Sequence, residues 1–503
     1  MAREDPGPWD RRMENEKIGN TQSPRALILL TGAGLMGGLV LATFIAVYGI
    51  NQGVDSATLP VAGRTLNQFM AVVLTCIALI VPLTANLYTP KLVTLYVKHP
   101  LIVVMLSLLL ASHIICLALN FTPAGSLLNR LLVDALALIY LVVITGALPF
   151  LYAISRFLRP SYFVPMLTRK ALRSLRVLGQ TKRVEAHKDN LFEIIDVVTN
   201  MALTGMARGD RQLVLRSMGS LHTLLAGIIA SGPGEGLGWR SSRPWFVPGL
   251  AKEGQGYLIR EQVWPEAYVL AQTLKITEVA TKRQHELLSE LASQLVDTAR
   301  LASEAGTEAV IELHVMTFNM LLREAVEQHD LRRFQNLSYY YRLLIEVFHP
   351  TPARMHEAAR HLLHYARMAT REGLGFAYET VVYDLGELVL SLGRQGEERA
   401  VELIQAWAGP IWQDAITHDT GLKKVGWRAL LRTHWEARTL GLKEVADAIY
   451  WRFLTDEAIH REQLELLIEE NRELHYEFND RLMRFAYLTP PAEAEAQAFL
   501  EQW

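Results

Sequence analysis

Apolar residues fill four long runs in the first third of the chain. The runs cover residues 26–48, about 66–87, 100–119 and 127–154. Each has about 20 or more mostly apolar residues, which is enough to cross a hydrocarbon core of roughly 30 Å at about 1.5 Å per residue. The pattern therefore predicts four membrane-spanning helices.

After residue 159, polar and apolar positions recur with the period of an amphipathic helix. In 191–206 and 311–325, apolar side chains return every three or four residues, and no alternating strand run with hairpin signals is present. Glycine, proline and aspartate interrupt the pattern, for example at Gly209-Asp210 and His329-Asp330. The breaks leave pieces of roughly 15–22 residues, a length typical of antiparallel helix pairs. We expect an all-α fold, with a repeat-like array of the tetratricopeptide or HEAT kind after the spans.

These patterns divide the chain into four parts: a segment of 1–24, a four-span region of 25–158, a basic amphipathic segment of 159–190 and a helical domain of 191–503. Lys and Arg are abundant before the first span and after the fourth. Between the spans they occur chiefly in the second loop, at Lys91 and Lys98. This alternation predicts that both termini are cytoplasmic. The mixed charge of 1–24 and the length of the first apolar run argue against a cleavable signal peptide.

Composition adds little to this architecture. The 503 residues carry a net charge of −2, which averages two unlike parts and does not indicate nucleic-acid binding. Both cysteines, Cys76 and Cys116, lie in predicted spans, so the helical domain has no disulfide framework and no CxxC metal site.

Small residues mark one face of the first span. Gly34, Gly38, Ala42 and Ala46 recur every fourth residue. Small side chains allow two helix backbones to approach closely in lipid. The face is a candidate for oligomerisation, and packing against another span of the same chain explains it equally simply.

The segment after the fourth span is basic and amphipathic. Its candidate contacts with anionic lipid headgroups are Arg156, Arg159, Arg169, Lys170, Arg173 and Arg176. An ordinary positively charged flank on the cytoplasmic side is the alternative explanation.

Polar residues inside the spans are the candidates for a transport path. His113 and Asp134 lie at similar depths in the third and fourth spans, and Arg130 precedes Asp134 by one turn. Intramembrane ionisable groups usually face a bundle interior or a wet cavity. A structural hydrogen bond, or an Arg130–Asp134 pair, is the simpler interpretation.

The linker at 231–254 contains aromatic residues that are candidates for a surface contact. Its glycines and prolines exclude a long helix, and Trp239, Trp245 and Phe246 are suited to a membrane interface or a partner surface. The alternative is that these rings pack back onto the helices.

No catalytic, cofactor or metal motif is present. The ExxH pairs Glu346–His349 and Glu457–His460 are about as frequent as chance predicts, and HExxH, GxSxG and Walker A sequences are absent. We therefore expect neither an enzyme nor a bound cofactor or metal.

The stretches SRFLRPSYFVPMLTRKALRSL (155–175) and LFEIIDVVTNMALTGMARGDRQLVLRSMGSLHTLL (191–225), following four spans, carry a resemblance. This layout resembles an uncharacterised family of bacterial predicted inner-membrane proteins with a helical cytosolic region. The resemblance implies a bacterial inner-membrane location and transfers no catalytic residue.

Two functions fit these features. The leading hypothesis is a membrane-anchored, oligomeric scaffold whose helical array binds an unidentified cytosolic protein. The alternative is an oligomeric ion channel or transporter in which the helical domain serves as gate or sensor.

Overall fold

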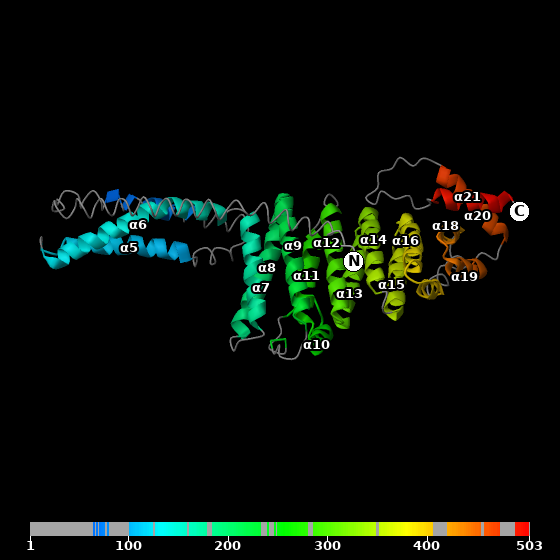
Figure 1. Ribbon diagram of the computed structural model, residues 1–503, viewed down its shortest axis with the longest axis horizontal. Coiled ribbons are helices and arrows are strands. Elements are labelled where there is room, and N and C mark those ends of the chain that lie inside the picture. The colour runs from blue at the N-terminus through cyan, green and yellow to red at the C-terminus, as the bar shows by residue number, and fades with distance from the viewer. Residues whose placement is uncertain are drawn as a thin grey trace, which may run out of the picture. The chain divides into compact units, whose positions relative to one another are not determined.

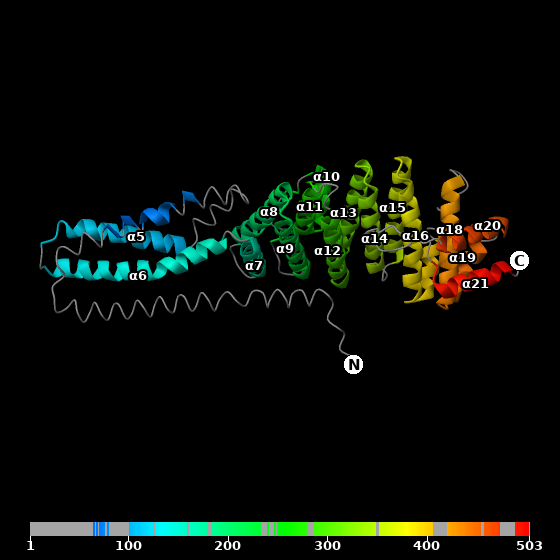
Figure 2. The same ribbon diagram turned by 90° about the horizontal axis from the view of Figure 1, so that it is seen from above.

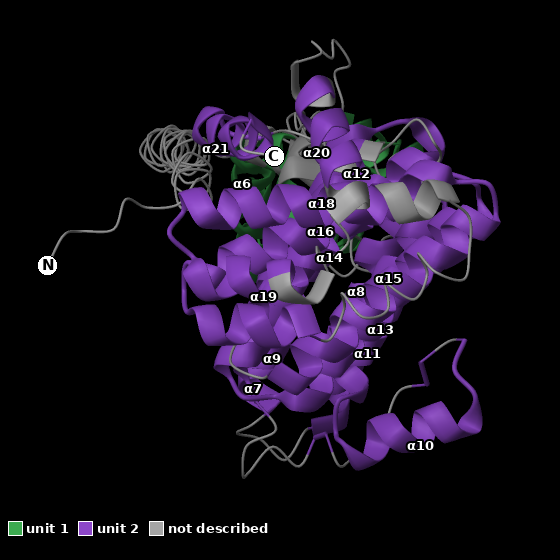
Figure 3. Ribbon diagram, turned by 90° about the vertical axis from the view of Figure 1, so that its right-hand side faces the viewer, with its two compact units in different colours: residues 1–166 green, residues 167–503 purple. Residues whose placement is uncertain are grey.

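The computed structural model describes most of the chain after residue 100. The described residues are 64–65, 67–68, 70–75, 78–79, 100–123, 126–157, 160–178, 184–232, 239–240, 246–247, 249–279, 285–348, 352–405, 420–453, 457–472 and 488–501. The chain separates into two compact units, Met1–Met166 and Leu167–Trp503 (Figure 3). Every secondary-structure element in the described residues is a helix, as the sequence predicts.

Unit 1 contains a hairpin of two apolar helices, α5 (Pro100–Leu119) and α6 (Leu127–Phe157). Leu136, Val143 and Phe150 are buried and follow each other at seven-residue intervals along α6. Gly146 lies on the same side, because a Cβ atom there would meet the Met105 methyl group of α5 at 3.5 Å. This side of α6 therefore packs on α5.

Three helices are long and apolar enough to cross a membrane: Ile102–Leu119 in α5, Leu127–Ala147 in α6, and α9 (Arg211–Ala230). The first two are the third and fourth predicted spans. The first predicted span lies outside the described residues, and the second is described only at 67–68, 70–75 and 78–79. Helix α9 is not among the predicted spans, and 56% of its residues are buried within the structure.

Unit 2 is built from short helices. Their bounds are α7 (Pro160–Leu178, which begins in unit 1), α8 (Val184–Arg208), α9, α10 (Lys252–Arg260), α11 (Trp264–Val279), α12 (His285–Glu304), α13 (Glu308–Glu327), α14 (Leu331–Val347), α15 (Pro352–Arg371), α16 (Gly375–Gly393), α18 (Thr420–Thr439), α19 (Lys443–Phe453), α20 (Glu457–Arg472) and α21 (Pro490–Glu501).

The helices of unit 2 form two rows. The helices of the first row, α9, α12, α14, α16, α18 and α20, contact one another in that order. The helices of the second row, α8, α11, α13 and α15, do the same, and the rows pack together through pairs such as α8–α9, α13–α14 and α15–α16. Figures 1 and 2 show α8 to α16 standing side by side along the unit. The described part of unit 2 is thus a two-layer helical array.

The spacing of the helices makes this array repeat-like. The second-row helices α11, α13 and α15 begin at residues 264, 308 and 352, at intervals of 44 residues. The first-row helices α12, α14, α16 and α18 begin at 285, 331, 375 and 420, at intervals of 46, 44 and 45. Helix pairs of this length are typical of HEAT and armadillo repeats.

Two turns of the array use the same local chemistry. Gly209 and His329 both have positive φ angles, of 71° and 51°, and each is followed by an aspartate. Asp210 accepts a hydrogen bond from the Leu213 amide at 3.0 Å, and Asp330 accepts one from the Arg333 amide at 3.1 Å. The aspartates therefore cap α9 and α14, which explains why the sequence signals breaks at these points.

Candidate membrane and interaction surfaces

The hairpin of α5 and α6 exposes large apolar side chains over most of its length. Those in α5 include Val104, Leu110, Ile114 and Leu117, and those in α6 include Leu127, Leu131, Leu138 and Val142. Fewer than a quarter of the residues in either apolar window are buried. A contiguous apolar surface of this kind is unfavourable in water and normally marks a contact with lipid or protein.

The polar residues of this hairpin do not form the pair that the sequence suggested. His113 Nδ1 donates to the Leu109 carbonyl oxygen at 2.8 Å, and its Nε2 lies 3.3 Å from Asn67 Oδ1. Asp134 and Arg130 are exposed, and neither side chain has a hydrogen-bond or ion-pair partner among the described residues. The histidine thus has an amide partner in place of the carboxylate.

Helix α7 has one buried apolar face and one exposed basic face. Leu167, Ala171, Leu175 and Leu178 are buried, and the predicted headgroup residues Arg169, Lys170, Arg173 and Arg176 are exposed. A hydrogen bond between the Thr168 and Ser220 hydroxyl groups, and one that Asn190 donates to Ser174, attach the second half of α7 to α9 and α8. The basic face is therefore held in a fixed orientation on the array.

The small-residue face, the predicted headgroup contacts and the linker aromatics each include residues that the structure does not describe. Gly34, Gly38, Ala42 and Ala46 of the small-residue face all lie outside the described residues. Arg159 and Trp245 also lie outside them, and Arg156 is described only as part of helix α6.

The linker before α10 is anchored by a buried ion pair. Arg240 makes two hydrogen bonds with Glu266 of α11, from Nη1 to Oε2 at 2.9 Å and from Nη2 to Oε1 at 2.7 Å. Both side chains are almost fully buried, and Nη2 also donates to the Ile228 carbonyl oxygen of α9. Separating the two side chains would leave an uncompensated buried charge, which is costly. The pair therefore holds the linker against α9 and α11.

The two described aromatic residues of the linker behave differently. Trp239 is fully buried, with its ring 5.8 Å from that of Trp264, so it is part of the core and is not a surface anchor. Phe246 is 67% exposed.

Helix α10, which follows the linker, is attached to the second row. It contacts α11, and Tyr257 of α10 donates a hydrogen bond to Glu312 of α13 at 2.6 Å. Burial and this carboxylate raise the pKa of Tyr257 to about 12.

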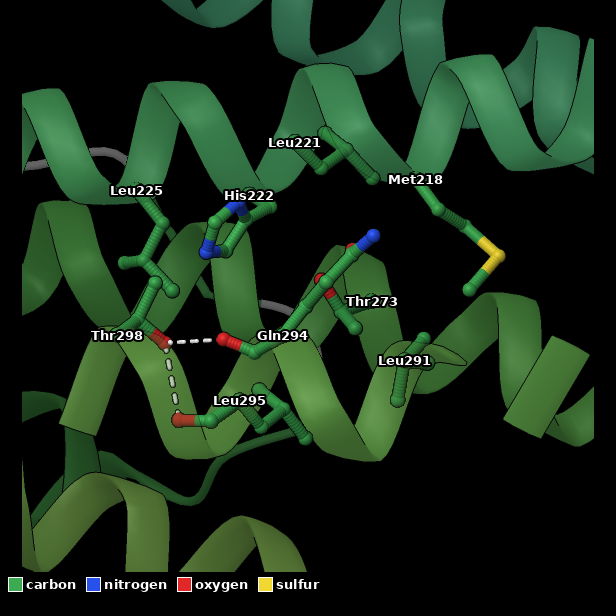
Figure 4. A pocket seen from close by; sticks show the side chains of 9 residues that line it. All are labelled: Met218, Leu221, His222, Leu225, Thr273, Leu291, Gln294, Leu295 and Thr298. Atoms are coloured by element: carbon green, nitrogen blue, oxygen red, sulfur yellow. Dashed lines mark hydrogen bonds between the residues drawn. The ribbon is translucent and has the colours of Figure 1, made fainter. Parts of the chain in front are cut away.

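A small cavity that no sequence pattern indicated lies between α9, α11 and α12 (Figure 4). Its volume is about 20 Å³, roughly the space of one water molecule. Leucines and Met218 line most of it, and His222 Nε2 is buried there without a hydrogen-bond partner among the described residues. Burial lowers the pKa of His222, while the nearby Asp297 and Glu290 carboxylates oppose this shift. The cavity is too small for an organic ligand.

A second buried histidine that was not among the predicted site residues is His314 of α13. It is fully buried, and its Nε2 lies 2.9 Å from Thr298 Oγ1, next to the cavity. The sequence does show a histidine at an otherwise apolar position of a helix. That pattern does not distinguish a buried core histidine from a metal-binding one. In the described residues, no group of three His, Cys, Asp or Glu side chains is arranged to hold a metal ion.

Comparison with known proteins assigns no family. No protein-family model matches the chain, and no curated protein matches it. A solved structure described as a "Circular tandem repeat protein with novel repeat topology and enhanced subunit contact surfaces" is similar over 79% of this chain and 96% of its own length. The TM-score is 0.34 and the sequence identity is 15%. Similarity at this level carries no information about function or assembly.

Proposed function

We propose that the chain is a membrane-anchored scaffold that presents its helical array to a protein partner on the cytoplasmic side. The observation that carries the proposal is the contrast between the two units. Helices α5 and α6 expose long apolar faces, whereas α8 to α18 bury theirs in a two-layer array. The exposed apolar faces of α5 and α6 suit a lipid environment. The array, whose apolar faces are buried, suits water.

Two further features support this proposal. The exposed basic face of α7 suits anionic headgroups, each basic residue near the surface contributing roughly 1 kcal/mol. Helical arrays present extended surfaces and bind other proteins through them. We further propose a bacterial inner membrane, several spans and cytoplasmic termini, on the basis of the alternating loop charges and the resemblance in layout.

The proposal is tested with three tagged proteins in the native host: the full chain, residues 167–503 and residues 1–166. The full chain and 1–166 should remain in the membrane fraction after an alkaline carbonate wash, and 167–503 should be released. The same cytosolic protein should co-purify with the full chain and with 167–503, but not with 1–166.

Two results would contradict the proposal. One is release of the full chain by carbonate, since a spanning protein resists that wash. The other is a partner that co-purifies equally with 1–166, because the array would then have no role in binding. A periplasmic reporter that is active when fused after Trp503 would contradict the proposed orientation.

A further inference from the structure

One side of α6 carries a charged residue in an otherwise apolar stripe. Leu127, Leu131, Asp134, Leu138 and Val142 are all exposed and recur every three or four residues. Asp134 and Leu138 each lie two positions from the buried Leu136, and two helical residues turn through about 200°. The stripe therefore lies on the side of α6 opposite to the side that packs on α5.

The two charges of α6 lie together on this exposed surface. Arg130 precedes Asp134 by one turn, and both side chains are exposed. Neither has a partner among the described residues. The helix thus presents a guanidinium and a carboxylate about 6 Å apart along its axis, four residues at 1.5 Å each.

The sequence restricts what can neutralise Asp134 within the membrane. Across 26–48, 66–87, 100–119 and 127–154, Arg130 and Asp134 are the only Lys, Arg, Asp or Glu residues. A charge in the hydrocarbon core is costly and is usually paired. His113, the other group in these spans that can carry a positive charge, is bonded to Leu109 and Asn67. The remaining opposite charge that a predicted span can offer to Asp134 is Arg130, either of its own helix or of another copy.

We infer that this stripe of α6 packs against the same stripe of a second copy of the chain, with Arg130 of each copy paired to Asp134 of the other. Copies in one membrane share an orientation, so a two-fold axis along the membrane normal makes the two pairs equivalent. An extended arginine side chain spans the one-turn offset. The spacing of the stripe is that of a left-handed helix pair. The inference rests on the membrane location of α6 proposed above.

The experiment exploits the fact that both charges lie on one helix. Arg130→Asp produces a chain with two carboxylates on the stripe, and Asp134→Arg produces one with two guanidinium groups. Each variant alone places like charges against each other in a dimer. Co-expression of the two variants, with different tags, restores two opposite pairs per dimer, but only if pairing occurs between copies.

The readout is a disulfide across the two-fold axis in membranes. Leu138→Cys is introduced into each protein, with Cys76→Ser and Cys116→Ser to remove the native thiols. We expect cross-linking of the otherwise unchanged protein, a decrease of about tenfold in each charge variant alone, and recovery in the mixed dimer carrying both tags. Ile144→Cys, exposed but outside the stripe, serves as the matched control and should cross-link poorly.

The result that overturns the inference is mixed expression that cross-links no more than either variant alone, while all proteins remain in the carbonate-washed membrane. A stripe that faces lipid in each copy, instead of a second copy, predicts that outcome. Recovery of the unchanged protein in the soluble fraction would overturn both this inference and the proposed membrane location.

Discussion

The buried His314 shows how a single side chain in the array is adapted to its surroundings. Its Nδ1 lies 2.8 Å from the Val310 carbonyl oxygen, which can only accept a hydrogen bond. The neutral ring therefore carries its proton on Nδ1 and accepts from the Thr298 hydroxyl at Nε2. Burial lowers the pKa of His314 to about 4, and the bond to Val310 opposes the shift only in part.

This lowered pKa predicts a dependence of stability on pH. The unfolded chain takes up the proton near pH 6.5 and the folded chain only near pH 4, so acidification between these values favours unfolding. The contribution of neutral His314 is complete above pH 6.5 and decreases by about 3 kcal/mol by pH 4. We expect His314→Gln to flatten the pH dependence of the unfolding free energy of the 167–503 fragment, measured by urea denaturation.

The exposed His329 provides a control for this measurement. His329→Gln should leave the slope between pH 6.5 and pH 4 close to that of the unchanged fragment. A His314→Gln fragment with an undiminished slope would show that other groups dominate the acid response.

At the scale of elements, glycine determines how closely two first-row helices approach. Gly386 of α16 lies against Thr433 of α18, and a Cβ atom at 386 would overlap the Thr433 hydroxyl oxygen. That hydroxyl donates to the Ala429 carbonyl oxygen at 2.8 Å. Because threonine is branched at Cβ and this bond holds its rotamer, the side chain has little freedom to move away.

We therefore expect Gly386→Ala to destabilise the array by roughly 1–3 kcal/mol, although alanine favours a helix by about 1 kcal/mol. Gly219 of α9 is the matched control, because no side chain or neighbouring helix lies within 4 Å of a Cβ placed there. Gly219→Ala should raise the midpoint of thermal unfolding while Gly386→Ala lowers it. A rise in both would mean that α16 and α18 can separate without cost.

At the scale of the molecule, the main contacts among the described helices of the array are between neighbours. Helix α9 contacts α7, α8, α11 and α12, while α18 contacts α16, α19, α20 and α21. In such repeat structures stability is approximately a sum of local and nearest-neighbour contributions. Damage at one end should therefore remain local.

Leu224→Ala tests this locality, because Leu224 of α9 is fully buried and the change should cost about 2–5 kcal/mol. Hydrogen exchange should accelerate in α8, α9, α11 and α12, and stay unchanged in α16 and α18. Equal acceleration in all of these helices would instead indicate that unit 2 unfolds as a single cooperative block.

The sequence by itself determined the features that depend on local chemistry. Helical periodicity predicted the all-α class, the Gly209-Asp210 and His329-Asp330 breaks predicted real turns, and apolar length identified α5 and α6 as candidate spans. Only the tertiary structure decided which apolar or polar surface is covered. Helix α9 is apolar enough to span a membrane and yet packs in the array, and Trp239 is buried beside an Arg240–Glu266 pair. Burial is decided by partners distant in the chain, which local composition does not identify.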